Sequence, residues 1–278
     1  MDTSLQKADI WKRISAFLCD AVCIIFVSCA MALLLIWVTG INNHAATMTE
    51  RRDAIITEAG YVLPDDVETT EDGDGNTIIL TPKENIYPDS SEDVENLTDE
   101  QKERYYATEE LIRNDERYSK AQMIFINLSL IIITVSILSA FLIFEILIPL
   151  LLKNGQTLGK KVFGVAIMRA DGVRIPTALL FLRSIVCKFT LETMVPVMAI
   201  VGAVLFQWWV MAGILVIGIL GLQIILFLAT KEHTPIHDIC TYTVAVDMGS
   251  QKIFGSAEEK AEYIAMIQRE RAEDDRDY

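Results

Sequence analysis

Five ionisable residues lie in or beside the long apolar runs of this chain: Asp20, Glu145, Arg183, Lys188 and Glu192. A charge at the centre of a membrane helix costs roughly 2.5–3.5 kcal/mol on insertion scales, so each of them needs a partner or a purpose. They either pair to fix how helices pack, or line a polar cavity for a cation or small solute. On the second interpretation, Asp20, Glu145 and Glu192 are the candidate cation-binding or proton-accepting groups.

The spacing of these charges limits their partners. Arg13 lies seven residues before Asp20, which places both within about 20° on one helical face. They are about 10.5 Å apart along the axis, too far to bond directly. Asp20 is about two turns inside its apolar run, and we expect it to lie within hydrogen-bonding reach of Arg183 on another helix, or to be joined to it by water. Lys188 and Glu192 are four residues apart and can pair within one helix.

Catalytic and metal-binding patterns are missing from the sequence. The chain has three histidines, and no arrangement of serine, cysteine and histidine suggests a nucleophile. No zinc-ligand spacing is present, and the five cysteines fit small buried hydrophobes. We therefore expect no enzyme, metal or cofactor. Nucleic-acid binding is not expected either, because the few basic residues on the predicted cytoplasmic side are explained by membrane topology.

The apolar residues predict an integral membrane protein. They make up 52% of the 278 residues and cluster in runs longer than the about 20 residues that span a bilayer. The first span is Ile14 to about Val38, too long for a signal peptide's apolar core and interrupted by Asp20. The second runs from Met123 to Leu152. Residues 177–229 must hold two more, which meet near Gln207-Trp208-Trp209.

Residues 41–121 form an acidic insert between the first two spans. They contain eight Lys and Arg against 21 Asp and Glu, giving 8 − 21 = −13 of the formal net charge of −14. Val67–Thr70 and Thr77–Leu80 flank a glycine- and aspartate-rich turn and predict a hairpin. Thr98 opens a charged helix. The thin apolar content predicts a small extracytoplasmic domain.

A basic loop, Asn154–Arg174, separates the second and third spans. Short loops rich in Lys and Arg stay in the cytoplasm, so this loop predicts the orientation of the whole chain. We expect a helical turn over Thr157–Phe163 and then a hairpin whose turn is Asp171-Gly172. The first arm of that hairpin, Val165–Met168, alternates like Thr243–Val246 in the tail, and we expect these two segments to pair as strands.

Three motifs in this order resemble the RDD family of bacterial membrane proteins, named for one arginine and two aspartates. KRISAFLCD contains Arg13 and Asp20, GQTLGKKVFGVAIMRADG precedes Arg183, and IHDICTYTVAVD contains Asp238. The resemblance implies a bacterial cytoplasmic-membrane protein, with transport of ions or small solutes the usual suggestion. It also leads us to expect that Asp238 approaches Arg13 from the tail. The long acidic insert departs from the compact family pattern.

The predicted architecture is an all-α membrane protein with four transmembrane helices, an acidic extracytoplasmic insert and a small cytoplasmic β-element. Both termini are expected in the cytoplasm. Two functions remain open: transport of a cation or small solute, or an accessory subunit that binds proteins through its insert and tail. The expected partners are membrane lipids and a homo-oligomer or membrane-protein complex, because four helices make a thin wall. The predicted segments are 1–40, 41–121, 122–152, 153–176, 177–229 and 230–278.

Overall fold

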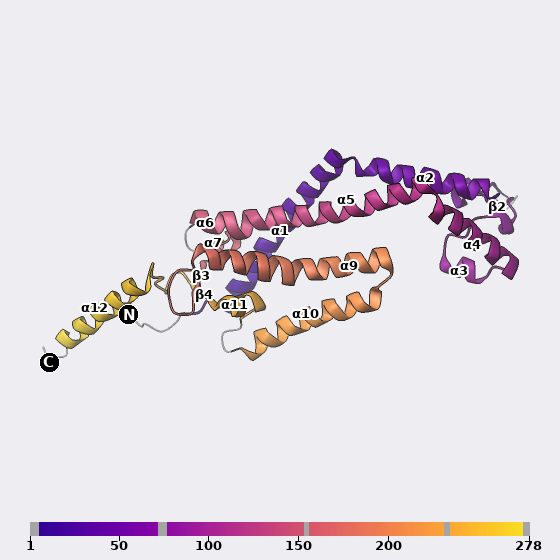
Figure 1. Cartoon of the computed structure of the whole chain (residues 1–278). Coiled ribbons are helices and arrows are strands. Elements are labelled where there is room, and N and C mark those ends of the chain that lie inside the picture. The colour runs from indigo at the N-terminus through magenta and orange to yellow at the C-terminus, as the bar shows by residue number, and fades with distance from the viewer. Residues whose placement is uncertain (1–5, 72–76, 153–155, 231–233, 275–278) are drawn as a thin grey trace. The chain divides into compact units, whose positions relative to one another are not determined.

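The computed structural model describes residues 6–71, 77–152, 156–230 and 234–274 (Figure 1). The chain forms two compact units, Met1–Met31 with Thr134–Tyr278, and Ala32–Ile133. The described residues contain four helices long and apolar enough to cross a membrane: Ile10–Thr39, Glu116–Leu152, Thr177–Leu205 and Trp209–Ala229. Large side chains such as Phe26 and Ile217 are more than 70% exposed on these helices, as suits surfaces that face lipid.

The four spans agree with the predicted number and places. The first is α1 (Ile10–Thr39), and the fourth is α10 (Trp209–Ala229). Gln207, with a φ of 61°, reverses the chain between α9 and α10, at the predicted meeting point of the third and fourth spans. The second and third spans each consist of three segments. The second span contains α5 (Glu116–Phe141), η3 (Leu142–Leu147) and α6 (Ile148–Leu152). The third contains α8 (Thr177–Phe181), η4 (Leu182–Met194) and α9 (Val195–Phe206).

The segments η3 and η4 are π-helical, which the sequence did not predict. Their backbone N–H groups bond five residues back, as Val195 does to Thr190. The Thr193 hydroxyl donates to the carbonyl of Lys188 with the same spacing. In an α-helix, residues five apart point about 140° away from one another. A π-helix brings them one above the other, so Arg183 and Lys188 share a face.

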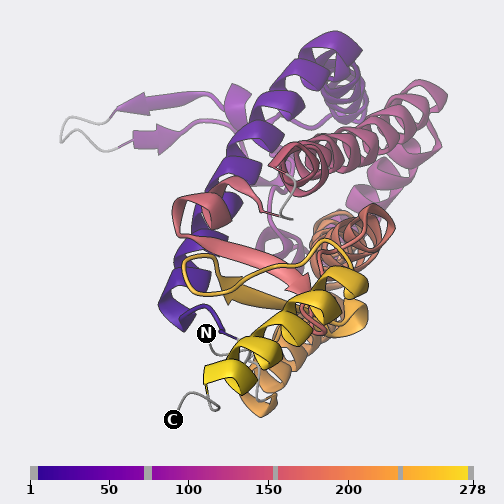
Figure 2. The same cartoon turned by 90° about the vertical axis from the view of Figure 1, so that its left-hand side faces the viewer.

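The predicted pairing of loop and tail is confirmed. Strand β3 (Val165–Arg169) runs antiparallel to β4 (Thr243–Asp247), as Figure 2 shows, with Ile167 opposite Ala245. Ala166, Met168, Val244 and Val246 form its buried cluster. The turn at Asp171-Gly172 also forms, closed by the bond from the Gly172 N–H to the carbonyl of Arg169. The predicted second arm is a single bridge from Met168 to Arg174 rather than a strand.

Short helices flank this sheet. Helix α7 (Leu158–Val162) matches the helical turn predicted before β3. Helix α11 (Ile236–Thr241) precedes β4 and carries Asp238. The charged tail forms α12 (Ala257–Asp274). These connections place α7 and α11 beside the spans within the same unit.

The unit Ala32–Ile133 has its own hydrophobic core. Ile55 and Ile56 of α2 (Ile41–Glu58) pack with Tyr61, Tyr87 and Ile112. The predicted hairpin is present as β1 (Thr69–Glu71) and β2 (Thr77–Ile79), and its turn lies outside the described residues. The predicted helix start at Thr98 is also confirmed, because Thr98 and Gln101 form a capping box at α4 (Asp99–Asn114). A short helix, α3 (Ser91–Glu95), precedes it.

Candidate functional site

A cavity of about 240 Å³ lies in the unit that contains β3 and β4. Residues of α1, α7, β3, η4, α10, α11 and β4 line it. Its wall includes six residues predicted as a polar network: Arg13, Asp20, Arg183, Lys188, Glu192 and Asp238. The seventh predicted residue, Glu145, lies behind this wall and binds Lys188. Lys160 and His237 also line the cavity, although the sequence did not single them out.

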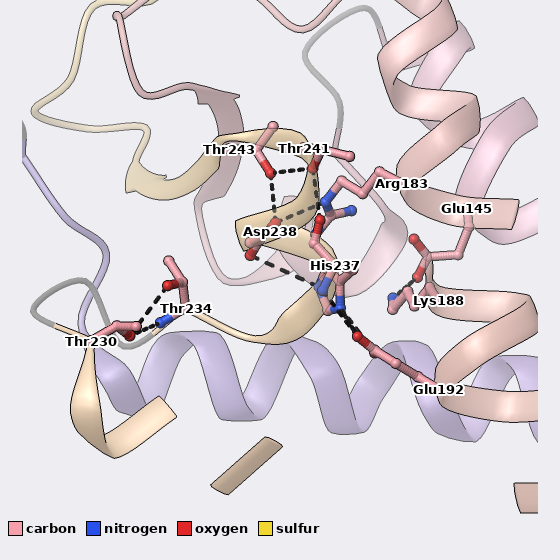
Figure 3. A network of polar contacts seen from close by, with 10 residues as sticks. All are labelled: Glu145, Arg183, Lys188, Glu192, Thr230, Thr234, His237, Asp238, Thr241 and Thr243. Atoms are coloured by element: carbon pink, nitrogen blue, oxygen red, sulfur yellow. Dashed lines mark hydrogen bonds and ion pairs between the residues drawn. The ribbon is translucent and has the colours of Figure 1, made fainter. Parts of the chain in front are cut away.

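Arg183 and Asp238 form a buried ion pair. The Arg183 Nε–H donates to Asp238 Oδ1 at 2.8 Å, and the Thr243 hydroxyl donates to the same oxygen at 2.7 Å (Figure 3). Burial alone would raise the pKa of Asp238, but Arg183, His237 and Thr243 stabilise the carboxylate and hold its pKa below the usual value. Asp238 thus pairs with Arg183, and the expected approach of Asp238 to Arg13 stays a prediction. The Arg13 guanidinium lies over the ring of Phe227.

Asp20 binds the start of α7 rather than Arg183. It is 2% exposed, and it accepts hydrogen bonds from the Thr157 hydroxyl and from the Gly159 N–H, the latter at 2.7 Å. Both donors are uncharged, so the expected direct bond from Arg183 to Asp20 is wrong. Uncapped N–H groups at a helix start satisfy a carboxylate without a cation. The sequence signal was the Thr157-Leu158-Gly159 start, which we interpreted only as a helical turn.

Gly159 explains how α7 approaches the first span so closely. A Cβ at this position would lie 2.2 Å from the carbonyl oxygen of Ala16 on α1. No side chain fits at that distance, so glycine is needed for the Gly159 N–H to reach Asp20. The same contact brings Lys160, the next residue, to the cavity wall.

The π-helix η4 directs its charges to two other elements, η3 and α11. Lys188 donates to Glu145 of η3, and the Ser184 hydroxyl donates to the carbonyl of Glu145 at 3.0 Å. Glu192 accepts from the backbone N–H of His237 at 3.0 Å and contacts its Nδ1 at 2.9 Å. Lys188 and Glu192, whose spacing allows a pair within one helix, instead each meet a group on another element (Figure 3).

His237 is buried and holds α11 against η4. Burial and the nearby Arg183 lower its pKa, while Asp238 and Glu192 act in the opposite direction. The net effect keeps the imidazole neutral near pH 7, where Nδ1–H can donate to Glu192. Its position next to Asp238 in the IHD motif was the only sequence signal for this role.

Lys160 differs from Arg183 and Lys188, each of which pairs with a carboxylate. Its ammonium nitrogen is buried and has no hydrogen-bond partner among the residues that the structure describes. Burial and the positive charge of Arg183 lower the pKa of Lys160 to about 8, although Glu145 and Asp20 partly compensate. The sequence analysis counted Lys160 only as a basic residue that orients the chain.

The side chains that line the cavity suit a solute with hydrogen-bond acceptors better than they suit a metal ion. No group of three or more His, Cys, Asp or Glu residues suited to a metal occurs in the described part of the chain. Asp20, Glu192 and Asp238 already accept hydrogen bonds, whereas the Lys160 ammonium has donors to offer.

Comparison with known proteins identifies the membrane region. The RDD family model matches residues 116–241, which include the last three spans, Arg183 and Asp238. Arg13 and Asp20 precede the matched residues. No curated protein and no solved structure matches the chain. The four apolar helices and the family match together show a multi-pass membrane protein. Residues 116–241 of this chain are therefore similar to the RDD family.

Proposed function

We propose that the protein transports a small solute across the bacterial cytoplasmic membrane through the charged cavity. The observation that carries this proposal is the cavity itself, about 240 Å³ and lined by eight ionisable residues beside three of the spans. Charged residues that only fix helix packing can be satisfied by direct pairs and do not need an open space between them. In this protein, direct ion pairs and an open cavity occur together.

The bonding pattern narrows the kind of solute. Asp20, Glu145 and Glu192 were the expected cation-binding groups, and each of them binds a neighbouring donor. A bare cation would have to displace the α7 backbone from Asp20, and the unpartnered Oε2 of Glu145 belongs to a residue that does not line the cavity. The cavity therefore favours a solute that brings its own hydrogen-bond acceptors.

The proposal includes an orientation and an assembly. The basic loop between the second and third spans and both termini are assigned to the cytoplasm, because Lys and Arg concentrate there. The cavity then opens near the cytoplasmic ends of the spans. Four helices make a thin wall around a pathway, so we include a second copy or a partner membrane protein in the transporting form.

Closing the cavity tests the proposal. Gln223 of α10 lines it, and Gln223→Trp should fill it and abolish solute flux in proteoliposomes. Ile225→Trp is the matched control, because Ile225 lies on the same helix and is 62% exposed. Osmotic light scattering with salts of a small cation, salts of a small anion and a neutral polyol measures flux. Equal flux in the wild-type protein and Gln223→Trp would contradict the proposal.

A second function, an accessory subunit that binds partner proteins, is favoured by one observation. The unit Ala32–Ile133 has its own buried core around Ile56 and Tyr87, and transport alone does not call for such a domain. Replacing residues 45–118 with a short linker distinguishes the two functions. If the cavity transports a solute, the deletion variant should retain flux. If neither the wild-type protein nor the deletion variant shows flux, and the deletion removes a co-purifying partner, the accessory role is favoured.

A further inference from the structure

Lys160 presents hydrogen-bond donors that no described residue accepts. An ammonium group has three donors, and burying it without an acceptor is costly. The second buried charged atom without a hydrogen-bond partner, Glu145 Oε2, belongs to a residue that does not line the cavity. On the cavity wall, the Lys160 ammonium is therefore the charged group that still needs a hydrogen-bond acceptor.

The charges around the cavity balance, but their hydrogen bonds do not. Arg13, Lys160, Arg183 and Lys188 are four cations on the wall, and Asp20, Glu192 and Asp238, with Glu145 behind the wall, are four carboxylates. Glu145 pairs with Lys188, Asp238 pairs with Arg183, and the oxygens of Asp20 are held by Thr157 and Gly159. A carboxylate that reaches the buried Lys160 ammonium would supply its missing acceptor and break none of these bonds.

The rest of the wall is apolar and the space is small. Ile14, Phe17, Val165, Ile167 and Phe227 contribute to it. Pockets for drug-sized ligands typically measure about 300–1,000 Å³, so a cavity of about 240 Å³ suits a smaller molecule. A carboxylate with a short apolar chain matches both the single donor group and the apolar surface.

We propose that the cavity binds a small monocarboxylate whose carboxylate accepts hydrogen bonds from the Lys160 ammonium. This inference rests on the proposed transport function and names its substrate class. Lys160 is the binding residue, and the apolar side chains of α1, β3 and α10 enclose the rest of the ligand.

Binding should depend on pH through Lys160. The charged groups around its ammonium are Arg183 and Lys188 of η4, Glu145 of η3, Asp20 and Arg13 of α1, and His237 and Asp238 of α11. The pKa of Lys160 is about 8 in this setting. A carboxylate should bind well at pH 6.5, and about thirtyfold more weakly at pH 9.5, where most of the ammonium has lost its proton.

The test uses the full-length protein purified in detergent and radiolabelled butyrate in equilibrium dialysis. Saturable binding is expected for the wild-type protein and for Lys161→Met, because Lys161 is the exposed neighbour on α7. Lys160→Met should reduce the affinity at least tenfold. Butanol and butylammonium should not compete. Thermal unfolding of each sample at both pH values verifies that the protein stays folded.

Four results would overturn the inference: equal butyrate affinity in Lys160→Met, no loss of affinity at pH 9.5, competition by butylammonium as strong as by unlabelled butyrate, and no saturable binding at all. Nanodiscs identify the source of the anion. If phosphatidylglycerol nanodiscs abolish binding that phosphatidylcholine nanodiscs allow, the site takes a lipid headgroup and the monocarboxylate is rejected. Butyrate binding without flux would reject transport and support the monocarboxylate site. Flux of another solute without butyrate binding would support transport and reject the monocarboxylate site.

Discussion

The Nε–H of Arg183 donates to Oδ1 of Asp238 across 2.8 Å, and both side chains are almost fully buried. Arg183 lies in the third span, and Asp238 lies in α11 beyond the fourth. The pair therefore links two segments separated by 55 positions and positions α11 against the cavity. Asp238 also accepts from Thr243 at the start of β4, so the same carboxylate links the span to the sheet.

Breaking this pair should be strongly destabilising. Asp238→Asn leaves a buried guanidinium without its carboxylate, which typically costs about 3–5 kcal/mol. Asp238→Asn combined with Arg183→Gln removes both charges and should recover much of that loss. Thermal unfolding of the single and double variants in detergent measures the coupling.

The exposed ion pair of Lys12 with Asp247 provides the control. The two side chains are 48% and 24% exposed, so Lys12→Met should leave the unfolding temperature almost unchanged. Strictly additive losses in the Arg183 and Asp238 variants would show that these residues do not stabilise the fold as a pair.

A closely packed glycine gives a second prediction. Gly159→Ala should destabilise the protein by about 1–3 kcal/mol, because its Cβ would lie 2.2 Å from the carbonyl oxygen of Ala16. Gly202→Ala is the control: Gly202 lies in α9 with no heavy atom within 4 Å of an added Cβ, so this change should be neutral or slightly stabilising. A Gly159→Ala protein that unfolds at the wild-type temperature would refute the close contact of α7 with α1.

Local patterns in the sequence predicted much of the fold. Apolar length located the four spans, and the short alternating segments identified β3 and β4, although β3 is buried on both faces. Thr98 marked a helix start through its reciprocal bonds with Gln101. These features depend on neighbours within a few residues, or on burial in lipid. A single sequence carries that information directly.

The pairings inside the cavity could not be predicted in the same way. The four-residue spacing of Lys188 and Glu192 allows a pair within the third span, but Lys188 binds Glu145 and Glu192 binds His237, both of which are distant in the sequence. Asp20 was expected to need a cation, because backbone N–H donors leave no mark in the residue types. They come from the start of α7, which only the close contact at Gly159 brings within reach.

The proposed orientation leads to a third prediction. In a cysteine-free background, Glu95→Cys of α3 should react with an impermeant thiol reagent in intact cells, since the insert is assigned to the outer side. Lys161→Cys of α7 should react only after the membrane is permeabilised. Both positions are exposed, so a difference in labelling reports the side of the membrane. If Lys161→Cys is labelled in intact cells and Glu95→Cys is not, the chain has the opposite orientation in the membrane.

The last prediction concerns the stability effect of Lys160. Its pKa is about 8 in the folded protein, below the ordinary value of 10.5, so folding disfavours the charged form. Between these two values the unfolded chain binds more protons than the folded one, and the free energy of unfolding should rise with pH. Below pH 8 the buried ammonium reduces stability. A shift of this size corresponds to roughly 3 kcal/mol at most.

Lys160→Met should therefore be more stable than the wild-type protein at pH 7. Its free energy of unfolding should also rise less between pH 8 and pH 10.5 than that of the wild-type protein, because Lys160 no longer titrates. Lys161→Met is the matched control and should follow the wild-type curve, because Lys161 is exposed on the same helix. Chemical denaturation at several pH values measures both curves, and their difference removes the contribution of every other titrating group. A Lys160→Met protein that is less stable at pH 7 would show that the ammonium makes favourable contacts. A stabilised variant that no longer binds butyrate would show that the buried charge is maintained for binding at a cost in stability.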